Sequence, residues 1–186
     1  ILVAGDLNAQ YQKWLDKKLI KEQHSTQNIT CEAVKTISIL MPVYNPNLKH
    51  LQEAVQSVLS QISPYWELCI ADDASTEPRV LDYLNGLVEQ DNRILLIRQG
   101  TNQGISNATN SALNIAKSEY VLFMDQDDIL RPHAILYFQK VLNEDNTLDL
   151  LYADEDKLEE QFGRRIDPHF KPEWSPHLLH SYNYIG

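Results

Sequence analysis

Basic residues are scarce in this sequence, and that scarcity excludes one class of partner. Lys and Arg number 16 against 26 Asp and Glu, which gives a formal net charge of -10. An acidic chain without a basic stripe repels a polyphosphate backbone, so we expect no nucleic-acid partner. An acidic protein that handles a diphosphate must bring a cation to it, so any acidic cluster near a predicted ligand site becomes important.

Cysteines and long apolar runs are also scarce. The only two cysteines, Cys31 and Cys69, do not have the spacing of metal ligands, and Cys69 lies in an apolar run that is typical of a buried thiol. No stretch reaches the roughly 20 apolar residues that a membrane-spanning helix needs. We therefore expect a reducing, cytoplasmic location. Membrane association would be peripheral, at the inner face of the membrane and through the parent chain.

The length of 186 residues suits one α/β domain with a short appendage. Residues 1–35 differ from the rest, because Tyr11, Trp14 and Leu15 fall at helical spacing and are followed by a polar stretch. We predict a helix and linker over 1–35 and one domain over 36–186. The sequence ends in mid-pattern, so we expect this domain to be incomplete at its C-terminal end.

Short apolar runs alternate with helical patterns from residue 36 onward. This alternation is typical of βαβ units, and it predicts an α/β fold: a Rossmann-like, mainly parallel sheet with helices on both faces. Ligands of such sheets bind outside the carboxyl ends of the strands. The predicted strands are Ile37–Met41, Trp66–Ala71, Ile94–Arg98 and Tyr120–Met124, and they are followed by polar clusters at 42–46, 72–76, 100–107 and 125–128.

The acidic cluster after the last predicted strand is Asp125-Gln126-Asp127-Asp128. Its carboxylates are hard oxygen ligands that could hold Mn²⁺ or Mg²⁺ against a substrate diphosphate. Such a cation would stabilise negative charge on a departing diphosphate. The alternative is that Asp128 or its neighbour caps a helix that begins around Arg131-Pro132.

Two earlier polar clusters add ligand chemistry. Asp72 and Asp73 follow a strand, where a carboxylate can accept the imide N–H of uracil or thymine, although an Asx turn is the alternative. The segment 102–107 precedes a predicted helix. Backbone N–H groups at a helix start favour an anion or a sugar hydroxyl.

In this order, the motifs resemble those of glycosyltransferase family 2, which has the A-type nucleotide-diphospho-sugar transferase fold. The family's P-x-Y-N, D-D-x-S-T, N-x-G and D-x-D-D segments read here as Pro42-Val43-Tyr44-Asn45, Asp72-Asp73-Ala74-Ser75-Thr76, Asn102-Gln103-Gly104 and Asp125 to Asp128. The similarity covers about 36–186. It extends to the bacterial branch that assembles rhamnose-containing and other surface polysaccharides.

The resemblance implies a transferase that moves a sugar from a UDP- or dTDP-sugar to a glycan or lipid-linked acceptor with inversion. Mn²⁺ or Mg²⁺ would be held by Asp127 and Asp125. The nucleotide contacts implied are Pro42, Val43, Tyr44, Asn45, Asp72, Asp73, Gly104, Asn107 and Asp125.

Two departures from the family pattern affect catalysis. Thr109 occupies a position where many members have Arg, so no guanidinium is available there to assist the diphosphate. The family's general base has no match before Gly186, and its loss slows a transfer that needs deprotonation of the acceptor. Glu155 is the only local substitute, and a solvated acidic turn is its ordinary interpretation.

Three other functions stay open. A non-catalytic nucleotide- or protein-binding domain would retain the fold without the base. A sugar nucleotidyltransferase would need a glycine-rich, basic loop in place of Pro42-Val43-Tyr44-Asn45. An aspartyl phosphatase would carry its D-x-D motif on the first core strand and Thr or Val where Ile129 stands.

Overall fold

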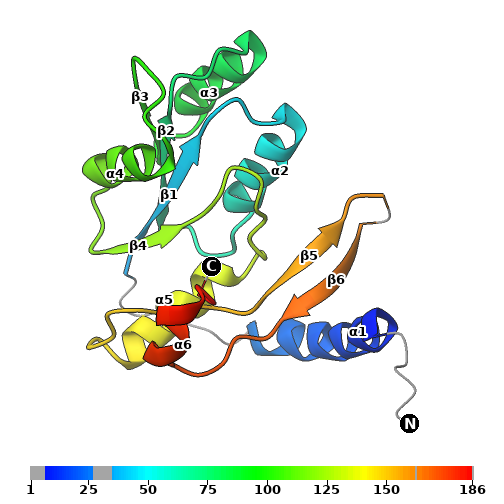
Figure 1. Cartoon of the computed structure of the whole chain (residues 1–186). Coiled ribbons are helices and arrows are strands. Elements are labelled where there is room, and N and C mark those ends of the chain that lie inside the picture. Colours follow the sequence, from blue (N-terminus) through cyan, green and yellow to red (C-terminus); the bar gives the residue numbers. More distant parts are fainter. Residues whose placement is uncertain (1–6, 27–34, 162, 186) are drawn as a thin grey trace. The chain divides into compact units, whose positions relative to one another are not determined.

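The computed structural model describes residues 7–26, 35–161 and 163–185, with the backbone alone for 19–26 (Figure 1). The chain divides into two compact units. The sheet unit is Cys31–Thr147, and the hairpin unit combines Ile1–Thr30 with Leu148–Gly186.

The sheet unit is built on four parallel strands. They are β1 (Ile37–Val43), β2 (Trp66–Asp72), β3 (Ile94–Arg98) and β4 (Tyr120–Phe123), and they lie in the order β3-β2-β1-β4. The predicted α/β fold with a parallel sheet is confirmed. The apolar runs locate the strands because a sheet covered on both faces buries every side chain of its inner strands; all seven residues of β2 are buried.

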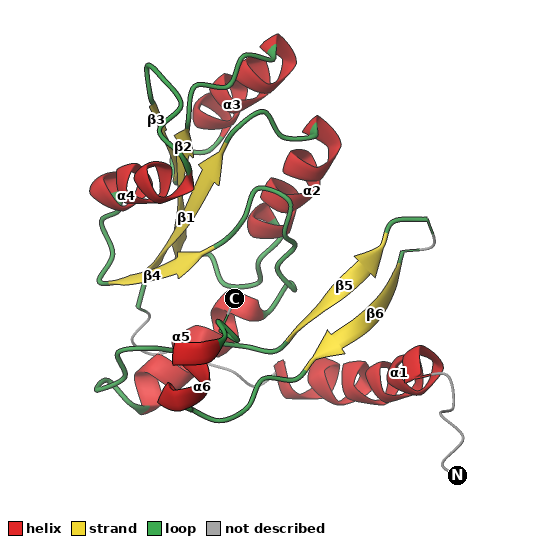
Figure 2. Ribbon diagram, viewed as in Figure 1, coloured by secondary structure: helices red, strands yellow, loops and turns green. Residues whose placement is uncertain are grey.

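Four helices follow the four strands. They are α2 (Leu48–Leu59), α3 (Pro78–Gln90), α4 (Ile105–Ile115) and α5 (Ala134–Glu144). Figure 2 shows α4 on one face of the sheet and α2 and α3 on the other. The α2 helix begins where the Asn47 side chain accepts the backbone N–H of Lys49, which satisfies one of the free donors of the first turn.

Small side chains join α4 to the sheet. Ala108 and Ala112 of α4 pack in one buried cluster with Leu40 of β1 and with Cys69 and Ala71 of β2. Alternate residues of a strand face opposite sides, so the intervening positions of β1 and β2 point toward the other helix layer. The alanines allow α4 to lie close above the sheet, which fixes where its first turn begins.

The helix expected to begin around Arg131-Pro132 is α5, and it begins two residues later, at Ala134. A turn in which Ala134 N donates to Arg131 O precedes α5, and the N-cap residue is His133. The carbonyl of Pro132 accepts the N–H of Ile62, which holds this segment against the α2–β2 connection. The N-cap position of α5 is therefore His133, and Asp128 does not occupy it.

The hairpin unit contains α1 (Leu7–Thr26), an antiparallel pair of β5 (Glu155–Glu159) and β6 (Arg164–His169), and α6 (Pro176–Ser181). The predicted N-terminal helix is present, with its Tyr11 hydroxyl 2.5 Å from Asp156 Oδ2. No helix within the described residues is long and apolar enough to cross a membrane. The division into 1–35 and 36–186 stays a prediction.

Candidate functional site

Four loops lie at one edge of the sheet. The strands are parallel, so their carboxyl ends, and the loops that follow them, share the same edge (Figure 2). Beyond β4 the pairing continues for one residue, as Met124 N donates to Leu40 O over 3.1 Å. The acidic segment 125–128 therefore leaves the sheet beside the end of β1.

Asn45 joins the loop after β1 to the loop after β2. Its backbone N–H donates to Ser75 Oγ over 2.9 Å, and its Oδ1 accepts the backbone N–H of Thr76 over 2.8 Å. Asn45 has a φ of 41°, in the left-handed region that Asn tolerates better than most residues. Asn45 of the P-x-Y-N motif is therefore bonded to Ser75 and Thr76 of the D-D-x-S-T motif.

Asp73 joins the loop after β2 to the start of α4. Its two carboxylate oxygens accept the backbone N–H groups of Gln103 and Gly104, each over 2.8 Å. Only 2% of Asp73 is exposed. A buried carboxylate that accepts two N–H groups makes strong, charge-assisted bonds, so Asp73 fixes the glycine at which α4 begins.

Asp72 is fully buried at the end of β2. Its Oδ1 accepts the backbone N–H of Ser75 over 3.0 Å, and its Oδ2 pairs with Arg98 Nε over 2.9 Å. This bond reaches three residues on, one residue further than in the Asx turn that was the alternative for Asp72. The role of Asp72 in contacting a base stays a prediction.

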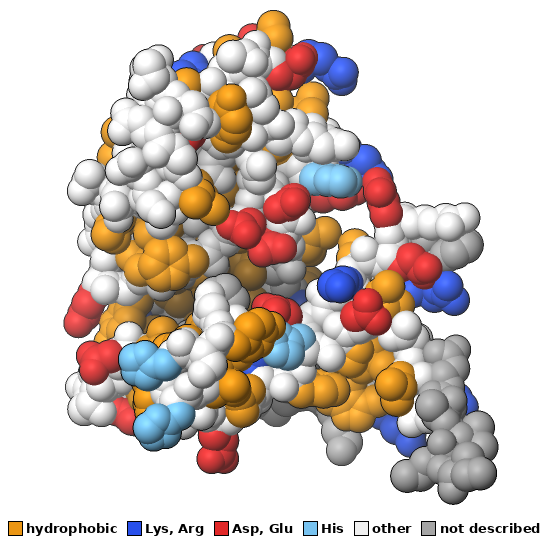
Figure 3. All heavy atoms as spheres, viewed as in Figure 1, with side chains coloured by type: hydrophobic (Ala, Val, Ile, Leu, Met, Phe, Trp, Pro, Cys, Tyr) orange, Lys and Arg blue, Asp and Glu red, His pale blue; other side chains and the backbone are white. Residues whose placement is uncertain are grey.

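Gln126 joins the acidic loop to the end of β1. Its Oε1 accepts the backbone N–H of Tyr44 over 2.9 Å. Together with Asn45 and Asp73, this bond links all four loops into one hydrogen-bonded edge. On the face of the sheet unit that is visible in Figure 3, acidic side chains gather near the loop that follows β4.

Asp125 and Asp127 are both exposed. Within the described part of the chain, no three His, Cys, Asp or Glu residues form a group that could hold a metal ion. Mg²⁺ in phosphate-handling sites is usually bound through one or two carboxylates, with substrate phosphates and waters completing the shell. Two open carboxylates therefore fit a cation shared with a ligand, and they do not form a closed structural site.

The other predicted nucleotide contacts differ in accessibility. Val43 is buried, Pro42 is half-buried, and Tyr44 is 46% exposed. Asn107 lies on the exposed first turn of α4 and donates from Nδ2 to Gln103 O over 2.9 Å. Gly104 has a φ of 87°, which only glycine adopts freely.

A shallow hollow of about 340 Å³ lies over the first turns of α4. It is lined by Ile105, Ser106, Thr109 and Asn110, so it adjoins Gly104 at the same edge. Thr109 donates its hydroxyl to the carbonyl of Ile105 over 2.8 Å. The lining of this hollow is uncharged, and it combines hydroxyl and amide groups with the apolar side chain of Ile105.

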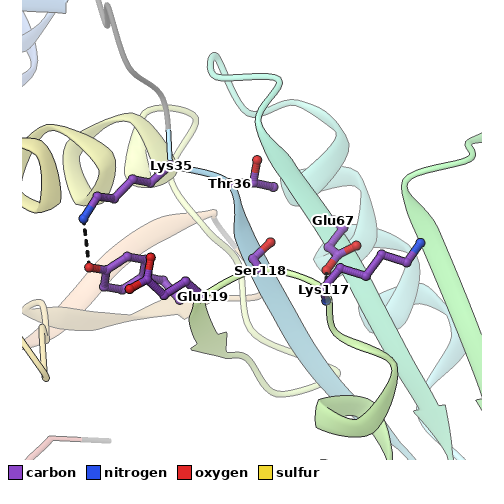
Figure 4. A pocket seen from close by; sticks show the side chains of 7 residues that line it. Lys35, Thr36, Glu67, Lys117, Ser118 and Glu119 are labelled. Atoms are coloured by element: carbon purple, nitrogen blue, oxygen red, sulfur yellow. Dashed lines mark hydrogen bonds between the residues drawn. The ribbon is translucent and has the colours of Figure 1, made fainter.

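A second hollow, of about 310 Å³, lies at the amino ends of the strands (Figure 4). Lys35 and Thr36 precede β1, while Lys117, Ser118 and Glu119 precede β4. Lys35 Nζ donates to the hydroxyl of Tyr120 over 2.9 Å. This hollow is at the opposite end of the sheet from the linked loops, and none of the predicted site residues lines it.

Glu155, the weak candidate for a general base, lies in the hairpin unit and is already paired. His169 Nδ1 is 3.1 Å from its Oε1, and Lys171 Nζ is 2.9 Å from its Oε2. Partial burial raises the pKa of Glu155, but the hydrogen bonds from Lys171 and His169 outweigh burial and bring the pKa below its usual value. A carboxylate held in this way is a weaker base than a free one.

Sequence reasoning missed Arg98 and the bonding role of Gln126. Arg98 was assigned to the end of a predicted strand, and Gln126 was treated as a spacer between carboxylates. Their position in the sequence could have identified them, because both residues lie at or just after the carboxyl end of a strand, where ligand sites of parallel sheets form.

Comparison with known proteins gives relatives over most of the chain. Residues 38–182 match the family described as Glycosyl transferase family 2. The chain is 42% identical over 150 residues to the uncharacterized protein y4gI of Sinorhizobium fredii, which is 81% of this chain and 16% of that protein. It is 36% identical over 149 residues to the O-antigen biosynthesis protein RfbC of Myxococcus xanthus, and this match covers 80% of this chain and 12% of RfbC. The chain thus spans less than a fifth of the length of these two relatives.

Solved structures of TarS from S. aureus share the fold. The TarS 1–349 structure in complex with UDP has a TM-score of 0.55 and 26% identity, and the match covers 60% of this chain and 33% of that one. The complex with UDP-GlcNAc has the same TM-score and identity, and the match covers 60% of this chain and 32% of that one.

Proposed function

The chain belongs to glycosyl transferase family 2, and on this premise we propose that it binds the donor of an inverting sugar transfer. The proposed donor is a UDP- or dTDP-sugar, and the acceptor is a glycan or lipid-linked glycan. UDP and UDP-GlcNAc in the TarS complexes support a nucleotide-sugar donor. The name of RfbC, an O-antigen biosynthesis protein, supports a polysaccharide product.

One observation carries the proposal: the four loops are bonded to one another while two carboxylates of the last loop stay exposed. Asn45, Asp73 and Gln126 fix the loops, so Asp125 and Asp127 have a defined position at the carboxyl edge of the sheet. Pre-positioned groups stabilise developing charge without reorganisation during the reaction. This is the arrangement that a departing nucleoside diphosphate needs.

Asp125 and Asp127 would hold Mn²⁺ or Mg²⁺ together with the donor diphosphate. When bound, such a cation acts as a Lewis acid toward the phosphate oxygens of the leaving group. The rest of the chain's contribution is binding and orientation. The Tyr44 loop lies beside the carboxylates through Gln126, and the N–H groups at the start of α4 are held by Asp73.

A second function, nucleotide binding without transfer, is favoured by the pairing of Glu155. Its two oxygens are held by His169 and Lys171, so the local candidate for the general base is engaged. Donor binding and sugar transfer therefore need separate measurements.

Calorimetric titration of this chain with UDP and with dTDP, with and without Mn²⁺, tests the donor site. We expect binding only with Mn²⁺, and its loss in Asp127→Ala, with Asp82→Ala on the exposed side of α3 as the matched control. Unchanged affinity in Asp127→Ala, with the fold verified by circular dichroism, would refute the metal-assisted site. If UDP binds with Mn²⁺ but incubation with UDP-GlcNAc and an acceptor glycan transfers no sugar, the result supports the second function.

A further inference from the structure

The hollow at the amino ends of the strands contains a buried carboxylate that no cation pairs with. Glu67 lines this hollow, and only 9% of the residue is exposed. Its Oε1 accepts the Ser38 hydroxyl over 2.5 Å and the backbone N–H of Lys117 over 2.6 Å. Both donors are neutral, and Glu67 forms no ion pair with any residue that the structure describes. Burial of a carboxylate without a counter-charge is costly, so further donors to Glu67 are favourable.

The second oxygen of Glu67 is open to the hollow. Oε2 accepts no hydrogen bond from the described part of the chain. Gln139 Oε1 is buried without a partner, whereas Glu67 Oε2 has no partner and is not enclosed. Because Ser38 and the Lys117 N–H hold Oε1, the position of Oε2 is fixed as well. A ligand group that donates a hydrogen bond would therefore meet an acceptor that is already in place.

The other side chains of the hollow offer both donors and acceptors (Figure 4). The ammonium group of Lys117 has no hydrogen-bond or ion-pair partner among the described residues. Thr36 and Ser118 contribute hydroxyl groups, and Glu119 an exposed carboxylate. With Lys35, two lysines and two glutamates line the hollow, so their formal charges cancel. An anion would face the carboxylates and a cation would face the ammonium groups, so the lining favours a neutral ligand.

A sugar ring matches this lining. Each sugar hydroxyl can donate one hydrogen bond and accept others, as the hydroxyls of Ser and Thr do. Of two adjacent hydroxyls, one can donate to Glu67 Oε2 and the other can accept from Lys117 Nζ. Hydrogen bonds from a hydroxyl to a carboxylate are charge-assisted and strong. The volume of about 310 Å³ is at the lower end of the range for small-molecule sites, which suits a single ring.

We propose that this hollow binds a neutral sugar unit of a glycan, with Glu67 Oε2 and Lys117 Nζ as its main contacts. The seven residues of β1 rise about 3.3 Å each, so the hollow and the linked loops are roughly 20 Å apart. The site is therefore separate from the proposed donor site. The hollow alone supports binding of a sugar, and the choice of a glycan as its source rests on the proposed function.

The test is a two-dimensional ¹H–¹⁵N NMR titration of the 186-residue chain with methyl glycosides of rhamnose, N-acetylglucosamine and galactose at millimolar concentration. A methyl glycoside has the blocked anomeric carbon of a unit within a glycan. We expect at least one of the three to shift the amide signals of Lys117 and Ser118, which line the hollow. The free sugars form a second arm, which distinguishes a glycan unit from a free monosaccharide.

Glu67→Gln changes the open oxygen alone. Its amide oxygen can still accept from Ser38 and the Lys117 N–H, while its NH₂ group replaces Oε2 with a donor. We expect affinity for the bound glycoside to fall roughly tenfold or more, the range of one charged hydrogen bond. Glu53→Gln, at an exposed position on α2, is the matched control and should bind as the wild-type chain does.

Lys117→Met provides a second variant at an exposed position, with Lys49→Met on α2 as its control, and keeps the test valid if Glu67→Gln unfolds. The inference is overturned if no methyl glycoside shifts the two amides, if only free sugars bind, or if the folded variants bind as tightly as the wild-type chain. Glu67→Gln should retain UDP affinity with Mn²⁺. A wild-type chain that binds a glycoside but no UDP would overturn the proposed donor site and support the sugar site, so the two failures are distinguishable.

Discussion

Asp73 Oδ2 accepts the backbone N–H of Gly104 over 2.8 Å, and this bond connects residues 31 positions apart in the sequence. With the matching bond from Gln103, it attaches the start of α4 to the end of β2. The second Asp of the D-D motif is therefore a structural element of the site as well as a predicted ligand contact. Its removal has consequences for stability that its motif alone does not indicate.

Asp73→Ala should destabilise the sheet unit by about 2–4 kcal/mol, because two backbone N–H groups lose a charged acceptor in a buried position. Urea unfolding followed by circular dichroism measures this loss. Asp82→Ala, on the exposed side of α3, is the matched control and should change stability by less than about 0.5 kcal/mol. Equal stability of the two variants would contradict the role assigned to Asp73.

Gly104→Ala should destabilise the chain by about 1–3 kcal/mol through backbone strain, because its φ of 87° and ψ of 163° form a conformation that essentially only glycine adopts. Gly104 has a φ of 87°, while a Cβ added there would meet no atom within 4 Å, so steric overlap does not contribute. Gly100→Ala is a matched control, because it too has open space and lies outside the positive-φ region. Urea midpoints of the two variants give the comparison, and a loss as large in Gly100→Ala would argue against strain at Gly104.

Cys69 should resist alkylation in the folded chain at pH 9. Burial first, and then the Glu67 carboxylate, raise the pKa of its thiol to about 12, while Lys117 opposes the shift. Iodoacetamide labelling is followed by mass spectrometry in the Cys31→Ser variant, in which Cys69 is the remaining cysteine. Labelling should appear when urea unfolds the chain, and rapid labelling of the native state at pH 9 would disprove burial of the thiol.

The same shift predicts a loss of stability in alkali. The unfolded thiol ionises near its usual pKa of 9.0 and the folded one near 12, so its contribution is complete below pH 9 and is lost as the pH rises toward 12. Urea unfolding at pH 8 and at pH 10 should show a smaller fall for Cys69→Ala than for the wild-type chain. Parallel falls in the two proteins would exclude Cys69 as a source of the pH dependence.

The strands, and the edge at which the site forms, could be predicted because apolar runs and turn residues are local signals. Ile94–Arg98 was predicted with its observed bounds, and Trp66–Ala71 fell one residue short of the end of β2. The bonds that organise the site could not be predicted, since they join loops distant in sequence. Neither the pairing of Arg98 with Asp72 nor the bond from Tyr44 to Gln126 leaves a periodic signal.

Local signals also failed at the start of α5. Pro in a first helical turn is a common pattern, and it placed the helix start at Arg131-Pro132. In the structure the carbonyl of Pro132 accepts the N–H of Ile62, and the helix begins at Ala134. A contact with a distant segment thus outweighed the local preference.

Gln126→Ala should weaken UDP binding more than it lowers stability. Gln126 Oε1 accepts the backbone N–H of Tyr44 at an exposed position, so water can replace the lost bond and the stability change should stay near 0.5–1.5 kcal/mol. The same bond holds the segment that carries Asp125 and Asp127 beside the end of β1. Its loss frees the two carboxylates, and binding must then include the entropy of ordering them, which we expect to lower affinity for UDP with Mn²⁺ about threefold to tenfold.

Gln52→Ala, an exposed Gln on α2, is the matched control for this change and should leave UDP affinity unaltered. Gln126→Glu provides a second comparison, since it retains an acceptor for the Tyr44 N–H and should keep most of the affinity. If Gln126→Ala binds UDP as tightly as the wild-type chain, the carboxylates do not depend on Gln126 for their position. In that case the cation and the diphosphate would have to order the acidic loop as they bind.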